Sequence, residues 1–147
     1  MFKHILLPTD GSKLSNRAIL TGIRFAGKIK ARVTALHVVP EFRPFADEGF
    51  VPMSPALKKR LDDEARSRAS KMLASVARLA RSRKVRCATL TVASDLPYEK
   101  IIETARKKKC DLIMMASHGR RGLSSLLLGS ETAKVLLHSR IPVLVVR

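Results

Sequence analysis

Residues 111–132 read DLIMMASHGRRGLSSLLLGSET, and the rest of the chain is organised around this stretch. It opens with an apolar run, Leu112 to Ala116, long enough for a strand that is buried on both faces. A basic loop with glycines follows, and Gly129-Ser130 stands just before a helical pattern. These features together are typical of a phosphate site, because glycines let backbone N–H groups approach an anion and a helix begins with unpaired donors. The alternative is a strand-to-helix connection with ordinary turn glycines.

The segments around this stretch alternate between the periods of a strand and of a helix. Short apolar runs predict strands at 3–7, 32–39, 85–93, 112–116 and 142–146. Apolar stripes at helical spacing predict helices at 14–27, 56–83, 97–109 and 132–137, with Ser12 and Asp95 as N-cap residues. Between them, residues 41–55 hold three prolines, a glycine and three phenylalanines, and we expect a long irregular segment that is mobile or folded over a site.

The order of these elements predicts an α/β fold. Strands that alternate with helices form a parallel sheet covered on both faces, so we expect a three-layer α/β/α domain over residues 1–147 with a five-stranded parallel sheet of order 3-2-1-4-5. This order places the ends of the first and fourth strands side by side, where open α/β sheets bind ligands. Pro8-Thr9-Asp10 and Ser117-His118-Gly119 follow those two strands and are expected to converge on one crevice.

Composition excludes several classes of protein. No apolar run approaches the length of a membrane span, and the run at 5–7 stops at Pro8, so neither a membrane anchor nor a signal peptide is expected. Cys87 and Cys110 lack metal or disulfide spacing and predict reduced, buried thiols in a cytoplasmic protein. The formal net charge of +17, from 29 Lys and Arg against 12 Asp and Glu, attracts polyanions. Because aromatic residues make up only 4% of the chain, we expect nucleic acid to bind non-specifically at most.

Sequence motifs narrow the kind of nucleotide site. The chain has no G-x-x-x-x-G-K-[ST] and no G-x-G-x-x-G after its first strand, which excludes a P-loop and disfavours a dehydrogenase-type dinucleotide fold. Over its whole length the chain resembles the universal stress protein family: HILLPTDGS at the start, LHVVP after the second strand, MMASHGRRGLSSLLLGS, and the terminal IPVLVV. Nucleotide-binding members carry Gly-x2-Gly-x9-Gly-Ser/Thr after the fourth strand. The matching positions here are Ala116, Gly119, Gly129 and Ser130, so the spacing is intact and the first glycine is alanine.

The resemblance implies a site for ATP or AMP, with or without Mg²⁺. Asp10 would hold Mg²⁺ or a ribose hydroxyl, and the backbone of Val38 would meet the adenine. Pro8 and Thr9 would line the ribose and metal side together with Asp10. The wall and phosphate cradle would be formed by Met115, Ala116, Gly119, Gly129 and Ser130. Arg120 and Arg121 are either phosphate contacts or solvated loop residues, and Glu131 would repel a phosphate if it faced inward.

The resemblance also implies a homodimer through strand 142–146, which as an edge strand would otherwise expose unpaired backbone groups. Whether the protein is an enzyme stays open, because no nucleophile–base–orienter set is evident. We expect a nucleotide-binding stress-response or sensor protein with at most weak ATPase activity. The alternatives are a slow ATPase or nucleotidyl-transfer enzyme, and a basic protein that docks on an anionic partner.

Overall fold

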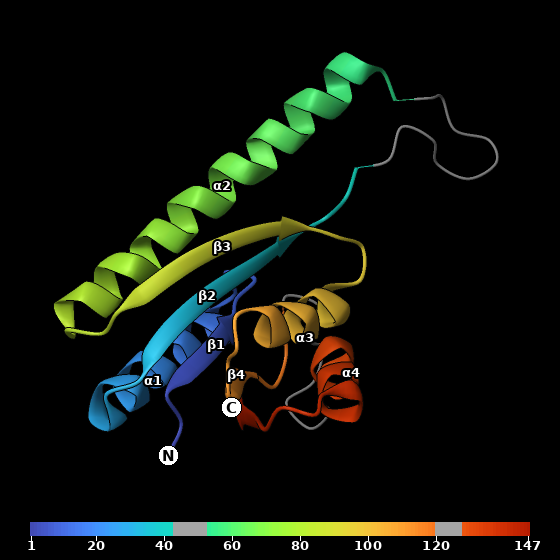
Figure 1. Cartoon of the computed structure of the whole chain (residues 1–147). Coiled ribbons are helices and arrows are strands. Elements are labelled where there is room, and N and C mark those ends of the chain that lie inside the picture. Colours follow the sequence, from blue (N-terminus) through green and yellow to red (C-terminus); the bar gives the residue numbers. More distant parts are fainter. Residues whose placement is uncertain (43–52, 120–127) are drawn as a thin grey trace.

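The computed structural model describes residues 1–42, 53–119 and 128–147 (Figure 1). Strands and helices alternate along these ranges, as the sequence predicts. In chain order they are β1 (His4–Pro8), α1 (Lys13–Ile29), β2 (Arg32–Val39), α2 (Pro55–Ser82), β3 (Cys87–Ala93), α3 (Pro97–Lys107), β4 (Leu112–Ala116), α4 (Ser130–His138) and β5 (Val143–Val146).

All five of these strands belong to one parallel sheet in the order β3-β2-β1-β4-β5, which confirms the predicted topology. β1 pairs with β2 from His4↔Arg32 to Pro8↔Leu36, and with β4 through Ile5↔Leu112. The chain therefore leaves β1 and β4 at the same edge of the sheet, which we call the carboxyl edge.

Helices cover both faces of the sheet, with α1 and α2 on one side and α3 and α4 on the other (Figure 1). The division follows from the two-residue alternation of a strand. Ile5 and Leu7 of β1 face α1 and α2, whereas Leu6 between them faces α3 and α4. All three side chains are fully buried, and each such burial stabilises the fold by about 2 kcal/mol. β1 is thus the centre of the molecule.

Several predicted element boundaries were wrong by one or two residues; α3, for example, ends at Lys107 and α4 begins at Ser130. The errors at the end of α1 and the start of β3 have related reasons. α1 was expected to end near Gly27, but it continues to Ile29 and ends where Lys30 takes a left-handed conformation with φ 57°. The strand predicted from residue 85 begins only at Cys87. Val85 still belongs to the turn that ends α2, because its N–H donates to the Ala80 carbonyl at 2.9 Å.

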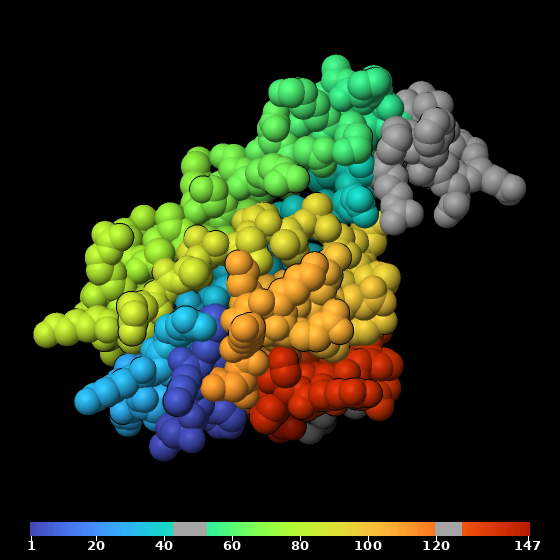
Figure 2. Space-filling view, in the orientation of Figure 1, coloured from blue at the N-terminus to red at the C-terminus, as the bar shows by residue number. Residues whose placement is uncertain are grey.

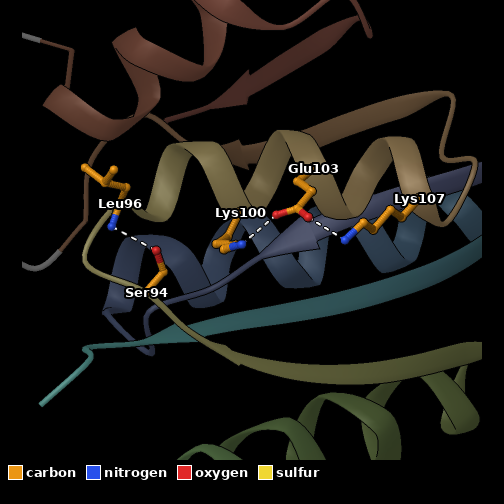
Figure 3. A network of polar contacts seen from close by, with 5 residues as sticks. All are labelled: Ser94, Leu96, Lys100, Glu103 and Lys107. Carbon is orange, nitrogen blue, oxygen red and sulfur yellow. Dashed lines mark hydrogen bonds and ion pairs between the residues drawn. The ribbon is translucent and has the colours of Figure 1, made fainter.

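The two predicted helix caps had different outcomes. Ser12 caps α1, since its hydroxyl accepts the N–H of Ser15 at 3.2 Å. Asp95 does not cap α3: the N-cap position is Leu96, whose N–H donates to Ser94 Oγ at 3.1 Å (Figure 3). Asp95 instead accepts the N–H of Glu41 at 3.2 Å and so ties the segment after β2 to the turn before α3.

The two edges of the sheet are β3, as predicted, and β5. In β5, Leu144 is 37% exposed, so this edge carries apolar surface.

Both cysteines are free thiols as expected, although Cys87 is only half-buried; burial raises the pKa of Cys110 to about 11 and keeps that thiol protonated. The phenylalanines at 45 and 50 lie outside the described residues. None of the described helices is long and apolar enough to cross a membrane.

Candidate functional site

The two polar segments that were expected to converge meet at the carboxyl edge. Asp10 follows β1, Gly119 follows β4, and these strands are paired neighbours. A Cβ atom placed on Gly119 would lie 2.6 Å from Asp10 Oδ2, closer than real Cβ contacts come. Gly119 therefore lacks a side chain where the Asp10 carboxylate lies against it, so the two segments meet as predicted; that they line one ligand crevice stays a prediction.

Hydrogen bonds fix the turn between β1 and α1. The buried hydroxyls of Thr9 and Ser15 are joined by a hydrogen bond, and Ser15 Oγ also accepts the N–H of Asp10 at 3.2 Å. Asp10 Oδ1 accepts the N–H of Ser12 at 3.0 Å. Gly11 has φ 78°, a left-handed conformation that glycine adopts without strain and that turns the chain toward α1. Local bonds thus set the direction of the Asp10 carboxylate.

Asp10 fits the role of a Mg²⁺ ligand only together with a nucleotide. In the described part of the chain no three His, Cys, Asp or Glu side chains come together in a way that would hold a metal ion. Mg²⁺ commonly uses one or two carboxylates and completes its shell with phosphate oxygens and water. A single carboxylate would suit that chemistry, and Asp10 would supply it.

The peptide groups of Val38 are directed toward the side of β2 that carries β1. β1 pairs with β2 as far as Leu36, whose carbonyl accepts the N–H of Thr9 at 2.8 Å. Alternate residues of a strand direct their peptide groups to the same side, so those of Val38 also point toward β1. Within the described ranges β1 has already ended at that level. The N–H and C=O of Val38 are therefore placed where a planar base could bond to them.

His37 is a site residue that sequence reasoning missed. Its Nδ1 donates to the carbonyl of Thr9 at 2.6 Å, which ties β2 to the segment that carries Asp10. A histidine one position before Val38 was visible in the sequence, but nothing there indicated a partner 28 residues away. We interpret His37 as a residue that positions the turn.

The end of β4 has ordinary strand geometry. Ala116 is not among the described residues with positive φ, as expected for alanine in a strand. Its carbonyl accepts the Thr132 hydroxyl at 2.9 Å, and the N–H of Ser117 donates to Val146 at 2.8 Å. The side chain of Met115 packs in the core under α3 and α4 and is 6% exposed, so Met115 can reach a ligand only through its backbone.

Gly129 is explained by packing within the chain. Its N–H donates to the Ser117 carbonyl at 2.8 Å, and a Cβ on Gly129 would lie 3.0 Å from that oxygen and 3.1 Å from His118 Cα. The missing side chain therefore brings the start of α4 against the turn after β4. A phosphate cradle is not needed to account for this glycine.

The first turn of α4 follows Gly129 and begins with Ser130, which is exposed. No side chain among the described residues caps this helix, so within those residues its first N–H groups have no side-chain acceptor and could donate to an anion. Glu131 points away from them: its carboxylate accepts the N–H of Tyr98 at 2.9 Å and pairs with Lys134 at 3.1 Å. The expected repulsion between Glu131 and a phosphate is thereby removed.

The loop that connects β4 to α4 is described only in part. Ser117 Oγ and His118 Nδ1 are hydrogen-bonded at 2.9 Å, and the buried Nε2 of His118 has no partner among the described residues. Arg120 and Arg121, the two candidate phosphate contacts of the loop, lie outside those residues.

Comparison with known proteins points to one family. The family model of the universal stress protein family matches residues 1–147. Universal stress protein MJ0531 of Methanocaldococcus jannaschii is 35% identical over 150 residues, covering 100% of this chain and 83% of that protein.

Solved structures show the same fold. That of protein MJ0577, from the same organism, superposes with a TM-score of 0.84 at 29% identity, covering 99% of this chain and 96% of that one. A universal stress protein solved in complex with cAMP superposes with a TM-score of 0.73 at 22% identity, covering 99% and 97%.

Proposed function

The chain belongs to the universal stress protein family, and from this premise we propose that residues 1–147 form one domain that binds ATP or AMP and acts as a nucleotide-responsive stress or sensor protein. The contact between Asp10 and Gly119 carries the proposal, because it joins the ends of β1 and β4 in one crevice. A universal stress protein with this fold was solved in complex with cAMP, an adenine nucleotide, which agrees with the proposed ligand class.

The proposed ligand lies along the carboxyl edge. The adenine meets the peptide groups of Val38, and Asp10 holds a ribose hydroxyl or Mg²⁺ beside the phosphates. Pro8, Thr9, Met115, Ala116 and Gly119 contribute walls and backbone. The phosphates meet the N–H groups at Gly129 and Ser130, where the positive end of the α4 dipole favours negative charge.

The starts of the four helices support this arrangement. α2 and α3 begin with a proline, which has no N–H to offer. α1 and α4 follow the two strands whose ends meet at Asp10 and Gly119. They start with Lys13 and Ser130, which both have a backbone N–H group at this position. We propose binding without rapid turnover, because the described residues at the carboxyl edge do not include a nucleophile–base–orienter set.

We propose further that the protein is a homodimer. β5 is an edge strand, and several exposed leucines lie on α4, just before it or on β5 itself: Leu128, Leu136, Leu137 and Leu144. Pairing of Val143–Val146 with a second copy would cover both the backbone edge and this apolar surface. The reduced cysteines still lead us to expect a cytoplasmic protein.

Substitution of Ser130 tests the proposed nucleotide site. Ser130→Pro removes one N–H from the first turn of α4, and the fold accepts proline because Gly129 before it has φ −61° and ψ 147°. Since a hydrogen bond to a charged group contributes about 1.5–3 kcal/mol, calorimetry should show about ten- to hundredfold weaker ATP binding.

Ser130→Ala is the matched control, because it keeps the N–H and removes only the hydroxyl. Equal ATP affinities for the proline and alanine variants would contradict the phosphate assignment. Absence of heat from the parent protein with ATP and AMP at millimolar concentration, together with no nucleotide in mass spectra of the purified protein, would refute the proposed function. A turnover assay on the same samples separates binding from slow hydrolysis.

A further inference from the structure

Three helices of this protein end in the same unusual way. α1, α2 and α3 are followed by Lys30, Lys84 and Lys109, with φ angles of 57°, 57° and 54°. In each case the next residue donates its N–H back across the turn: Ala31 to Ala26 at 2.9 Å, Val85 to Ala80 at 2.9 Å, and Cys110 to Ala105 at 2.8 Å. Glycine is the usual residue at this left-handed position, because a side chain there is strained.

These lysines lie along the amino edge of the sheet, opposite the carboxyl edge. Lys84 precedes β3, Lys30 precedes β2, Lys109 precedes β4, and Lys3 precedes β1 between them. Backbone bonds join neighbouring strand starts, since Val33 N–H donates to Arg86 at 2.8 Å and Arg32 N–H to Lys3 at 3.0 Å. Neighbouring strands lie about 4.8 Å apart, so the lysines form a row.

Further cations extend this row into a face that we call the amino-edge face. Figure 2 shows the end of α2, the end of α1 and the N-terminal residues gathered along one side of the molecule. Its cationic residues, all exposed, are Lys3, Lys28, Lys30, Arg32, Arg81, Arg83, Lys84, Arg86, Lys108 and Lys109.

Ion pairs are missing from this face in the described part of the chain. Within the described residues none of its cations forms one. Asp111 is the nearby carboxylate, and its two oxygens accept the N–H groups of Lys3 and His4 at 2.8 and 3.0 Å. Residues 65–86 contain eight Lys or Arg and no Asp or Glu.

The first half of α2 shows the opposite arrangement. Lys58, Lys59 and Arg60 each pair with an acid four residues later on the same helix, at 2.6, 3.0 and 3.0 Å. Charge on the amino-edge face is therefore left unbalanced, while charge at the other end of the same helix is neutralised.

Compensation of helix dipoles accounts for only part of this charge. A helix C-terminus carries about −0.5 charge, so three of them present about −1.5. Against this stand ten cations and one carboxylate on the amino-edge face. The dipoles would also be satisfied by lysines in the last helical turn, with no need for a left-handed conformation.

A cavity deepens the face beside Lys84. It has a volume of about 280 Å³ and is lined by Ala77, Arg81, Lys84, Val85, Arg86 and Cys87. The lining combines three cations with Ala77, Val85 and Cys87, and no acidic residue is among the lining residues. Burial raises the pKa of the Cys87 thiol, which keeps it neutral so that it does not oppose an anion. The cavity suits a phosphate group that projects from a larger molecule.

We propose that the amino-edge face binds the phosphodiester backbone of duplex nucleic acid without reading its sequence. A row of unpaired cations matches a regular row of phosphates, whose release of counterions drives such binding. Phe, Tyr and Trp together make up only 4% of the chain, so base stacking is not the basis of recognition.

A duplex fits this face better than a membrane. Membrane-surface sites add exposed apolar side chains to their cations. Among the described residues, the large apolar side chains that are exposed lie elsewhere, apart from Met1. The proposed nucleic-acid face and the proposed nucleotide site lie at opposite edges of the sheet. An experiment can therefore refute one of these two proposals and leave the other standing.

The left-handed lysines provide a sharp test. The triple variant Lys30→Gly, Lys84→Gly, Lys109→Gly removes three cations and places glycine where the backbone favours it. Its matched control is Lys58→Gln, Lys59→Gln, Arg60→Gln on α2. Each variant lowers the formal net charge from +17 by three, to +14. Binding is measured by fluorescence anisotropy with labelled 20-base-pair duplexes of DNA and of RNA, from 50 to 200 mM salt.

We expect the glycine variant to bind at least tenfold more weakly, with the slope of log K against log salt reduced by up to about 2.7, or 0.9 for each lost phosphate contact. The duplex affinity of the control variant should fall by less than threefold. The melting temperature of the glycine variant should equal or exceed that of the parent. Binding to one duplex type or to both supports the proposal. Comparison of the two affinities shows whether the face prefers DNA or RNA.

Three results would overturn it: equal losses in the two variants, no salt-dependent binding of the parent to either duplex, or tighter binding to vesicles with phosphatidylserine than to both duplexes. A lower melting temperature with unchanged duplex binding would assign the lysines a structural role instead.

Discussion

Substitution of Gly119 by alanine tests the contact that carries the proposed site. The new Cβ would lie 2.6 Å from Asp10 Oδ2, and Asp10 Oδ1 is held by the Ser12 N–H at 3.0 Å. The carboxylate must therefore turn away from its place. If Asp10 holds Mg²⁺ or a ribose hydroxyl, its displacement should cost about 1.5–3 kcal/mol, or about ten- to hundredfold in ATP affinity.

A double-mutant cycle shows whether Gly119→Ala acts through Asp10. Asp10→Ala should weaken binding by a similar amount, and it removes the atom that the new methyl group would meet. Gly119→Ala should then have no further effect in the Asp10→Ala background, which gives a coupling energy as large as the single effect. Calorimetry with ATP and Mg²⁺ on the four proteins measures the cycle, and melting temperatures verify folding. Strict additivity of the two losses would refute the reasoning.

Three other predictions follow from the structure. Ala116→Gly should change ATP affinity by less than tenfold, because the strand geometry at Ala116 does not need glycine; a larger change in calorimetry would contradict this. Truncation after Arg140 should convert a dimer to a monomer or an aggregate in sedimentation, and a stable monomer from the intact chain would exclude pairing through β5. Glu103 contacts Lys100 and Lys107 (Figure 3), whose hydrogen bonds lower its pKa from 4.5 to about 2. Ionised Glu103 therefore stabilises the fold above pH 4.5, and this stabilisation is lost as the pH falls toward about 2. Glu103→Gln should lower the melting temperature at pH 7 and have a shrinking effect in melts toward pH 3.

The elements and their order followed from the sequence because the signals are local. The run from Leu112 to Ala116 is apolar without interruption, and all five residues are buried in β4. Strand and helix periods alternate along the chain, and the short connections leave few topologies for a parallel sheet. The strand order and the two residues that meet at the carboxyl edge were predictable for this reason.

Details at the ends of elements were less predictable. Asp95 has the chemistry of an N-cap residue, yet it accepts the N–H of Glu41, and the N-cap position falls on Leu96, which forms no side-chain cap hydrogen bond. Gly27 has the chemistry of a helix end, yet the helix continues to a left-handed Lys30. In both cases a tertiary contact or the position of the next strand overrides a preference of about 1 kcal/mol or less.

The sequence by itself determined the fold class, the strand order and the convergence of Asp10 with Gly119, since each depends on short-range pattern and chain connectivity. Only the tertiary structure decided where side chains point across elements: that Glu131 turns to the start of α3, that His37 holds the Thr9 carbonyl, and that Gly129 packs against Ser117. It also gathered lysines from three helix ends on one face. These contacts join residues far apart in the chain, and periodicity along the sequence carries no information about them.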